Sequence, residues 1–556
     1  MRNVVAAVML GSVLVTGCAT PVPGTTATPT LQQVAFEPTA TAPPTNTPVP
    51  SPTPTVGPAD EGCLRARAEI PEGQNPTVFL TSGPASGCYD SVGEFLDDIG
   101  LTWGEFAPGT VITIWTRSPV DSEGMVVPPT PTPVPLSVTI SPSKEDGFEY
   151  VCGHPPFTVD FSARVTGGSG DLECAWDFDT DGRVDSRDQD PGPFTYGAPG
   201  VYNATLTVTD EAGQSSITER RIVAIGEPTW PSWKYGVMAH VQLTGQLYAD
   251  YAQSERAVRM VEEAGIEAIR LDLAWPVVEP NRKGEYDWRD YDRVVRMIRD
   301  HGIQILALVN YSARWASSGH MDDWNDWGLS APRNPRDFAD FAKAIVDRYP
   351  NDIHAWQIWG ETNCSLYFRG TNAATYTEML KQAYLAIKYS DPTAVVVLSG
   401  LASDASEWYP GVTFVEPTVF LQTIYDNGGR DYFDAVARHP YADPSPEGLD
   451  YVMGQLDSLR RVMVANEDAH KRIWITECGW SSSPPYSEER QAQWATAILP
   501  SLIGLDYVGP LFWYNLRDKG TDPNNFDDNL GLIRIDFTPK PAYYAYQEFI
   551  RQHPSP

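Results

Sequence analysis

The sequence predicts a multidomain chain in which a C-terminal (β/α)8 TIM barrel follows a β-sandwich and a small α+β module that contains a disulfide. Three observations predict this architecture. Proline-rich stretches divide the 556 residues into segments. Short strand-like runs between turns fill the middle of the chain, which is typical of a sandwich. Apolar runs alternate with amphipathic segments through the rest of the chain, which is typical of repeated βα units.

The first eighteen residues have the composition of an export signal. Arg2 supplies a positive charge, and the apolar run from Val4 to Val15 is too short to span a bilayer stably. The run ends in Val15-Thr16-Gly17-Cys18, which resembles the lipobox of bacterial lipoproteins. The resemblance implies a lipid anchor on Cys18 and a place on the bacterial cell surface, outside the cytoplasm. An ordinary cleaved signal peptide is the alternative.

Three linkers separate the predicted modules. Residues 19–58 contain 11 Pro and 11 Thr, so this stretch has almost nothing to bury and is expected to stay extended. Residues 128–136 and 227–233 are shorter linkers. The modules that they delimit are 59–127, 137–226 and 234–556.

Module 59–127 has no recognisable function. It contains Cys63 and Cys88, for which an oxidising compartment predicts a disulfide. Val92 to Ile99 is predicted as a short helix, and Thr110 to Trp115 as a strand.

Module 137–226 has the pattern of a β-sandwich. Trp176-Asp177-Phe178-Asp179, followed by Gly200-Val201-Tyr202, closely resembles a PKD domain. The resemblance implies an immunoglobulin-like sandwich of the kind that serves as a spacer in surface enzymes. Cys152 and Cys174 are predicted to form a disulfide within it. The strand-like runs are Leu136–Ile140, Phe157–Phe161, Tyr202–Thr209 and Thr218–Ile225.

An acidic turn lies in the same module. Its carboxylates alternate around Gly182, an arrangement that suits Ca²⁺ because this ion takes several oxygen ligands. No Glu follows at the last position of such a loop, so an acidic solvated turn and a structural calcium ion both stay open. The residues are Asp177, Asp179, Asp181 and Asp185.

Residues 234–556 alternate strands with amphipathic helices. Eight βα units predict a barrel, in which chemistry lies at the C-terminal ends of the strands. An open doubly wound sheet is the alternative, but no Gly-x-Gly-x-x-Gly turn follows the first strand. The candidate strands begin near Tyr235, Ala268, Ile305, Ile353, Ala394, Asp434, Ile473 and Leu511.

Two predicted strand ends carry a Glu among aromatic residues. Strand four runs through Gln357 to Glu361, and strand seven through Trp474 to Glu477. A carboxylate beside Trp and Ile is costly to desolvate, so its pKa rises or it finds a partner. Glycoside hydrolysis requires two such groups facing each other, because one protonates the departing oxygen and the other attacks the anomeric carbon. The pair therefore predicts a glycosidase.

The module resembles glycoside hydrolase clan A, most nearly family 39 and its endo-acting relatives. The resemblance implies that Glu361 is the general acid/base and Glu477 the nucleophile, braced by Arg270 and by the hydroxyl of Tyr441. It implies that Trp513 is a platform beneath the sugar. The other residues that match substrate-binding motifs are Trp275 and His439, and the loop aromatics that would line subsites are Trp315, Trp324, Trp327 and Trp480.

One position departs from the clan. Gly360 stands where the clan has an Asn that holds the sugar 2-hydroxyl. Asn363 is expected to substitute for it from the loop; otherwise the sugar differs at C2 or activity is weak. Cys364 and Cys478 flank the catalytic candidates, and a disulfide between them stays open.

The sequence therefore predicts a surface-anchored retaining O-glycosyl hydrolase that cleaves a polysaccharide or oligosaccharide. The alternative is an inactive or weakly active carbohydrate-binding lipoprotein, which Gly360 alone favours. The net charge of −32 makes nucleic acid an unfavourable partner, because phosphates would be repelled. No cofactor is required by this chemistry, and no His pair near the strand ends has metal-ligand spacing.

Overall fold

The computed structural model describes residues 64–69, 111–116, 135–143, 150–243, 245–404 and 411–555. Cys18, the Cys63–Cys88 pair and the helix expected at 92–99 lie outside these residues. Of module 59–127, the structure describes β1 (Leu64–Glu69) and β2 (Val111–Thr116), which pair in antiparallel register. The strand expected at 110–115 is thus β2.

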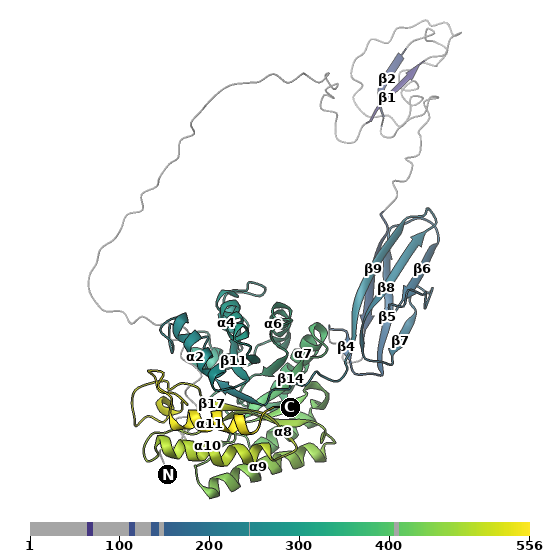
Figure 1. The fold of residues 1–556 in the computed structure, drawn as a ribbon. Helices are drawn as coiled ribbons and strands as arrows, with labels where there is room; N and C mark the ends of the chain where they lie inside the picture. The colour runs from purple at the N-terminus through teal and green to yellow at the C-terminus, as the bar shows by residue number, and fades with distance from the viewer. Residues whose placement is uncertain are drawn as a thin grey trace, which may run out of the picture.

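The sandwich consists, in the described residues, of a three-stranded and a four-stranded sheet (Figure 1). Its strands alternate buried and exposed side chains, so Phe157, Val159, Phe161 and Ala163 face the core from one strand. Trp176 lies fully buried between the sheets. The first sheet is β3 (Ser137–Ser143), β5 (Phe157–Thr166) and β7 (Gly192–Tyr196), and the second is β4 (Cys152–Gly153), β9 (Ser215–Ala224), β8 (Gly200–Asp210) and β6 (Leu172–Asp177).

The predicted disulfide between Cys152 and Cys174 is wrong, because both are reduced thiols. Cys174 lies on β6 and packs inside the sandwich. Cys152 lies on β4 and belongs to the core of the barrel module, where its thiol donates to the carbonyl of Leu385 at 3.3 Å. The two side chains therefore belong to different cores.

The sandwich contacts the barrel module along helix α7, beside β4 (Figure 1). The Tyr150 hydroxyl donates to Asp340 at 2.6 Å, and the Arg336 guanidinium lies 4.2 Å from the centre of the same ring. Arg221 of β9 donates to the carbonyl of Tyr389 at 3.1 Å. These contacts join the sandwich to the outer helices, away from the barrel strands.

The C-terminal module forms a closed barrel of parallel strands, as the sequence predicts (Figure 1). Neighbouring strands pair in chain order, and the last returns to the first. The strands are β10 (Tyr235–Met238), β11 (Ala268–Ala274), β12 (Gln304–Asn310), β13 (Ala355–Ile358), β14 (Val395–Leu401), β15 (Ala435–Arg438), β16 (Arg472–Cys478) and β17 (Val508–Tyr514).

Helices surround this barrel (Figure 1). Several begin at a side chain that caps the free amides of the first turn, such as Asp250, Asn334, Asn372 and Ser445. The α-helices are α2 (Tyr251–Glu263), α3 (Trp275–Val278), α4 (Arg289–Asp300), α5 (Trp324–Trp327), α6 (Pro335–Arg348), α7 (Ala373–Ser390), α8 (Pro417–Asp426), α9 (Pro446–Ala465), α10 (Glu488–Ile503) and α11 (Pro541–Gln552). Within the described part of the chain, none of the helices combines the length and the apolarity that a membrane span needs.

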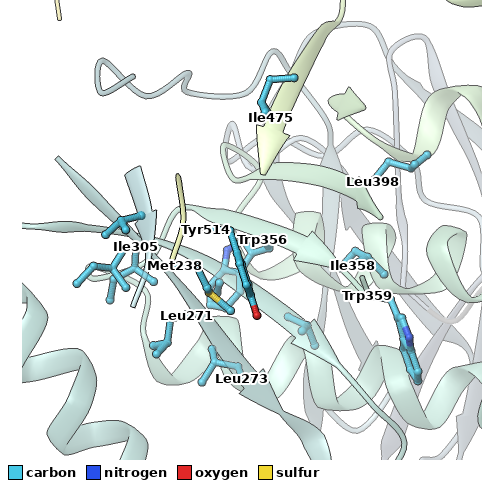
Figure 2. Close-up of a cluster of buried hydrophobic side chains, with 14 of the residues drawn as sticks. Met238, Leu271, Leu273, Ile305, Trp356, Ile358, Trp359, Leu398, Ile475 and Tyr514 are labelled. Atoms are coloured by element: carbon cyan, nitrogen blue, oxygen red, sulfur yellow. The ribbon is translucent and has the colours of Figure 1, made fainter. Parts of the chain in front are cut away.

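Residues of one barrel strand belong to two different buried clusters, one on each face of the strand. Ile269, Leu271 and Leu273 of β11 join the large core that includes the helices, part of which Figure 2 shows. Ala268 of the same strand joins a second cluster with Trp474 and Phe512, which fills the barrel beneath the site. Because a strand alternates its faces, Arg270 and Asp272 lie on the interior side.

Candidate active site

The two candidate glutamates meet at the C-terminal end of the barrel. Glu361 follows β13 and Glu477 lies near the end of β16, and each is only 7% exposed. One carboxylate oxygen of each lies within 4.8 Å of the other. Trp359 and Glu361 have φ angles of 63° and 52°, in the left-handed region that non-glycine residues seldom adopt. Such backbone strain is typical of functional sites.

Glu477 is held by two donors. Arg270 donates from Nη1 to Oε1 at 2.7 Å, and the hydroxyl of Tyr441 donates to Oε2 at 3.0 Å. Burial raises the pKa of Glu477, while the guanidinium and the hydroxyl act against that rise. The structure thus brings Arg270 and Tyr441 to Glu477 as the resemblance implied, and both donors favour the charged form against the effect of burial.

Glu361 has a different environment. His439 lies with Nδ1 2.7 Å from Oε1 of Glu361, while Oε2 is buried and has no hydrogen-bond partner in the described residues. Burial, and then the charge of Glu477, raise the pKa of Glu361 well above its usual value. Burial, and then the charges of Arg270 and Arg438, lower the pKa of His439 well below its usual value, so the ring is neutral.

The two carboxyl groups therefore have unequal electrostatic settings, because burial raises the pKa of both but hydrogen bonds from Arg270 and Tyr441 oppose the rise at Glu477. A group that keeps its proton can act as an acid, and a group held charged by Arg270 can act as a nucleophile. A buried pair of like charges cannot both ionise cheaply, which reinforces the division.

The pocket above them has polar and aromatic residues in its lining. Its aromatic side includes Tyr311, Trp359 and Tyr367. Sequence reasoning missed Asn310, Tyr311 and Tyr367, although Asn310 is a lone polar residue at the end of the apolar strand β12, which is a usable signal. The lining residues are Arg270, Leu308, Asn310, Tyr311, Trp359, Gly360, Glu361, Tyr367, His439 and Glu477.

A second polar group that the sequence reasoning missed centres on Asp272. Gln242 donates to it at 3.1 Å and Asn310 at 3.4 Å, and His240 Nδ1 lies 3.5 Å away. Buried atoms nearby, Nε2 of His240, Oε1 of Gln242 and Oδ1 of Asn310, have no partner in the described residues. Buried polar atoms normally have partners, so this group is suited to a ligand rich in hydroxyls.

Three predicted substrate-binding residues lie away from the pocket. Trp275 donates to Glu279 at 2.6 Å and stacks on Phe341 of α6. The Asn363 amide is committed to the backbone of Ala402 and Val415, so it does not take the place of the clan's Asn.

Trp513 is the third predicted substrate-binding residue that lies away from the pocket. It packs beside Tyr546 of α11, with ring centres 6.4 Å apart. The alternation of β17 turns its neighbour Tyr514 to the interior, where the ring lies 5.7 Å from that of His240.

Gly360 leaves space in the pocket. A Cβ atom there would approach only Arg270 Nη2 and Leu308 Cδ2, both at 3.8 Å. This position could therefore hold a side chain without a clash.

The loop tryptophans have mostly packing contacts. Trp315 donates to the carbonyl of Glu279 at 3.0 Å, and Trp480 is buried against Tyr486 and Phe526. Trp324 packs edge-on against Trp327 and against Tyr311, whose ring lines the pocket.

Cys364 and Cys478 are not joined by a disulfide. Burial raises the pKa of each thiol to about 12, so both stay protonated and are poor nucleophiles at neutral pH.

Among the described residues, two groups of side chains have the composition of a metal site. Glu361, His439 and Glu477 place one atom each within 4.8 Å of one another, but the Arg270 guanidinium beside them disfavours a cation. Asp177, Asp179 and Asp185 gather likewise in the sandwich. Their oxygens accept hydrogen bonds from backbone amides of the turn, and calcium binding there stays a prediction.

Comparison with known proteins identifies the class of the sandwich and of the barrel. Residues 235–437 match the model of glycosyl hydrolase family 53, and residues 397–534 match that of a glycosyl hydrolase catalytic core. Residues 141–225 match the PKD domain. The barrel is therefore related to glycoside hydrolases, and a PKD domain precedes it. The nearness to family 39 that the sequence suggested stays a prediction.

The individual relatives are distant. A β-xylosidase of Caldicellulosiruptor saccharolyticus is 22% identical over 316 residues, covering 51% of this chain and 62% of that protein. A chloroplastic β-glucosidase-like protein of Oryza sativa subsp. japonica is 19% identical over 370 residues, covering 54% and 55%. The chain thus spans less than two thirds of these relatives. Among solved structures, a family 39 glycoside hydrolase from Bacteroides cellulosilyticus WH2 has a TM-score of 0.46 at 22% identity, covering 68% of this chain and 77% of that one.

Proposed function

We propose that the barrel is a retaining glycoside hydrolase that cleaves a polysaccharide or oligosaccharide by double displacement, with Glu477 as nucleophile and Glu361 as general acid/base. The observation that carries the proposal is the unequal environment of two buried carboxyl groups whose oxygens lie within 4.8 Å. Inverting enzymes hold their carboxyl groups roughly 6.5–9.5 Å apart to leave room for a water, so this short distance supports retention.

In the first step Glu361 gives its proton to the glycosidic oxygen while a Glu477 oxygen attacks the anomeric carbon. The bond from that carbon to the leaving oxygen breaks, and a glycosyl ester forms on Glu477. In the second step Glu361, now a carboxylate, takes a proton from water, which attacks the ester and releases the sugar. Arg270 and Tyr441 hold Glu477 for attack.

The stereochemistry of the first-formed sugar tests the proposal. Proton NMR spectra recorded during the earliest turnover of an active polysaccharide are expected to show the anomer of the substrate. Inverted product would contradict double displacement. Substrates are found by incubating the purified protein with a panel of polysaccharides and analysing the products.

A second candidate function is carbohydrate binding without turnover, which Gly360 favours because it provides no side chain for the sugar. Calorimetry separates the two functions. Heat of binding with no product after long incubation, for the native protein and for Glu477→Ala alike, would favour the binding protein.

We further propose that the protein is lipid-anchored through Cys18 on the bacterial surface. The support is the sequence Val15-Thr16-Gly17-Cys18 and the Pro/Thr-rich stretch that follows it.

A further inference from the structure

A continuous chain of hydrogen bonds runs beneath the two glutamates. Arg270 Nε lies 2.9 Å from Oε1 of Gln357, and Nε2 of Gln357 lies 3.2 Å from the Thr476 hydroxyl. That hydroxyl lies 3.0 Å from Nε2 of His439, and Nδ1 of His439 lies 2.7 Å from Glu361. Arg270 also binds Glu477, so the chain connects the two carboxyl groups.

Arg270 fixes the direction of the first two bonds of this chain, and the proton of the Thr476 hydroxyl fixes that of the third. Arg270 can only donate, so the Gln357 atom that faces it is the carbonyl oxygen. The other Gln357 atom is then the amide nitrogen, which donates to the Thr476 hydroxyl. That hydroxyl has one proton of its own, and in the described residues Nε2 of His439 is the hydrogen-bonding neighbour that can accept it, so we assign the hydroxyl as the donor to His439.

The chain therefore fixes the tautomer of His439. Nε2 accepts from Thr476, so the proton of the neutral ring lies on Nδ1 and is donated to Oε1 of Glu361. An oxygen that already accepts this bond is not the oxygen that holds the acid proton. Oε2 of Glu361 is buried, has no partner in the described residues, and belongs to a residue that lines the pocket.

We infer that Gln357 and Thr476 are positioning residues, which hold His439 in the Nδ1–H tautomer and so reserve Oε2 of Glu361 for the catalytic proton. The inference rests on the proposed function for its consequence in turnover, but the tautomer is a property of the resting protein. In the acid step the O–H bond at Oε2 breaks and its proton passes to the leaving oxygen. That oxygen keeps the electron pair of the broken glycosidic bond.

Other charged groups surround this chain and do not change when Thr476 is replaced. Glu477 raises the pKa of Glu361, and Arg270 and Arg438 oppose that rise. Lys519 acts on Glu477. The titratable neighbours on other elements that interact with Glu361 are Cys364, Tyr367 and Tyr441.

The first test is spectroscopic and needs no substrate. The chain has 8 histidines, so ¹⁵N-histidine labelling gives few signals, and His439→Gln identifies the one of interest. In the wild type this histidine is expected to show protonated Nδ1 and unprotonated Nε2 at neutral pH. In Thr476→Val the nitrogen shifts are expected to move toward the Nε2–H tautomer, while Thr476→Ser keeps the wild-type pattern.

The second test reads the consequence in turnover. General acid catalysis contributes about 10²–10⁴-fold, so a proton held on the wrong oxygen is expected to lower kcat/KM of Thr476→Val on unactivated oligosaccharides by roughly 10- to 100-fold. Aryl glycosides with good leaving groups need no proton and are expected to change less than about threefold. In Thr476→Ser, the ratio of kcat/KM on the two kinds of substrate is expected to equal that of the wild type.

The pH profile gives a third readout. His439 donates to the charged form of Glu361 in the wild type, which favours that form. Loss of this donor raises the pKa of Glu361, so the basic limb of kcat/KM is expected to move to higher pH in Thr476→Val. If Thr476 only supported the fold, its replacement would lower kcat/KM equally on both substrate classes and would leave the basic limb in place.

Gln357→Glu tests the polarity of the chain without changing its shape. A carboxylate there accepts from both Arg270 and Thr476, so the Thr476 hydroxyl turns away from His439 and Nε2 must donate to it. The same Nε2–H signature as in Thr476→Val is expected.

Failure of this inference and failure of the proposed function give different results. A wild-type His439 with protonated Nε2, or nitrogen shifts unchanged in both variants, overturns the inference whatever the activity. If the wild type shows the Nδ1–H tautomer but cleaves no sugar, the proposed function fails and the assignment of the chain stands.

Discussion

Arg270 forms an ion pair with one of the two buried glutamates, Glu477, and so favours the charged form of that one. It is the cation in direct contact with Glu477, at 2.7 Å, and both side chains are buried. Removing one partner of a buried ion pair leaves the other charge uncompensated, which costs about 3–5 kcal/mol. The remaining carboxyl group would protonate rather than stay charged, and a protonated nucleophile cannot attack.

Arg270→Met is therefore expected to lower kcat/KM by on the order of 100-fold on every substrate, including activated aryl glycosides. Because the pKa of Glu477 rises further without the guanidinium, the acidic limb of the pH profile is expected to move to higher pH. Steady-state rates between pH 4 and 9 check this, and an acidic limb that stays in place would contradict the role of Arg270.

Gly360 offers a gain-of-function test at the same scale. A side chain there would make only ordinary contacts of 3.8 Å with Arg270 and Leu308, so Gly360→Asn is expected to fold with its melting temperature little changed. If the clan's Asn contact to the 2-hydroxyl is restored, kcat/KM on ordinary aryl glycosides should rise relative to their 2-deoxy analogues. An unchanged ratio would show that this space serves something other than the 2-hydroxyl.

At the scale of elements, the sequence was sufficient to predict the barrel strands and their order. It predicted the two glutamates because each ends an apolar strand among aromatic residues. The sequence could not predict which residues of β17 face the barrel interior and which face the helices. Strands of a parallel barrel are buried on both sides, and β17 is a near-continuous apolar run, VGPLFWY. The sequence therefore assigned Trp513 to the sugar, whereas the structure packs Trp513 beside Tyr546 and turns the neighbouring Tyr514 to the interior.

Contacts between separate segments explain the other differences between the prediction and the structure. Asn363 lies next to the site in sequence, but its amide is turned to the backbone of the following loop. His240 and Asp272 belong to the ends of neighbouring strands, and the parallel register of β10 with β11 brings them together. The sandwich disulfide failed because β4 faces the barrel helices, a contact that no pattern within the sandwich reveals.

Separate substitutions of Trp513 and Tyr514 give a direct test of this alternation. Trp513→Ala is expected to destabilise the barrel by about 3–5 kcal/mol, because it removes a fully buried indole from the core. Tyr514→Phe is expected to keep stability within about 1 kcal/mol and to lower activity, because its hydroxyl bonds Lys519 beside the site. Denaturant unfolding and kcat/KM check the pair, and the opposite pattern would place Trp513 at the sugar.

At the scale of the whole molecule, the sandwich is packed against the outer helices through Tyr150, Cys152 and Arg221. These contacts lie on α6 and α7, and in the described part of the chain no residue of the sandwich lines the candidate pocket. If the proposed function holds, the acidic chain, with a net charge of −32, is expected to favour neutral over anionic glycans.

Cys18→Ala tests the proposed anchor. The wild type expressed in a bacterial host is expected to sediment with membranes and to incorporate labelled fatty acid. The Cys18→Ala variant is expected to lose the label and to leave the membrane fraction or remain unprocessed. A wild type that is fully soluble outside the cell and carries no acyl group would contradict the anchor without bearing on the chemistry of the barrel.

The measurement that tests the central claim most directly is the stereochemistry of azide rescue in the two alanine variants. Glu361→Ala keeps the nucleophile, so on an aryl glycoside with a good leaving group it is expected to form the glycosyl ester. Azide should then speed its second step and give a glycosyl azide of retained configuration. Glu477→Ala has no nucleophile, so azide can only attack the sugar directly and give the inverted product. Retained azide from Glu477→Ala, with inverted azide from Glu361→Ala, would contradict the assignment of the two carboxyl groups.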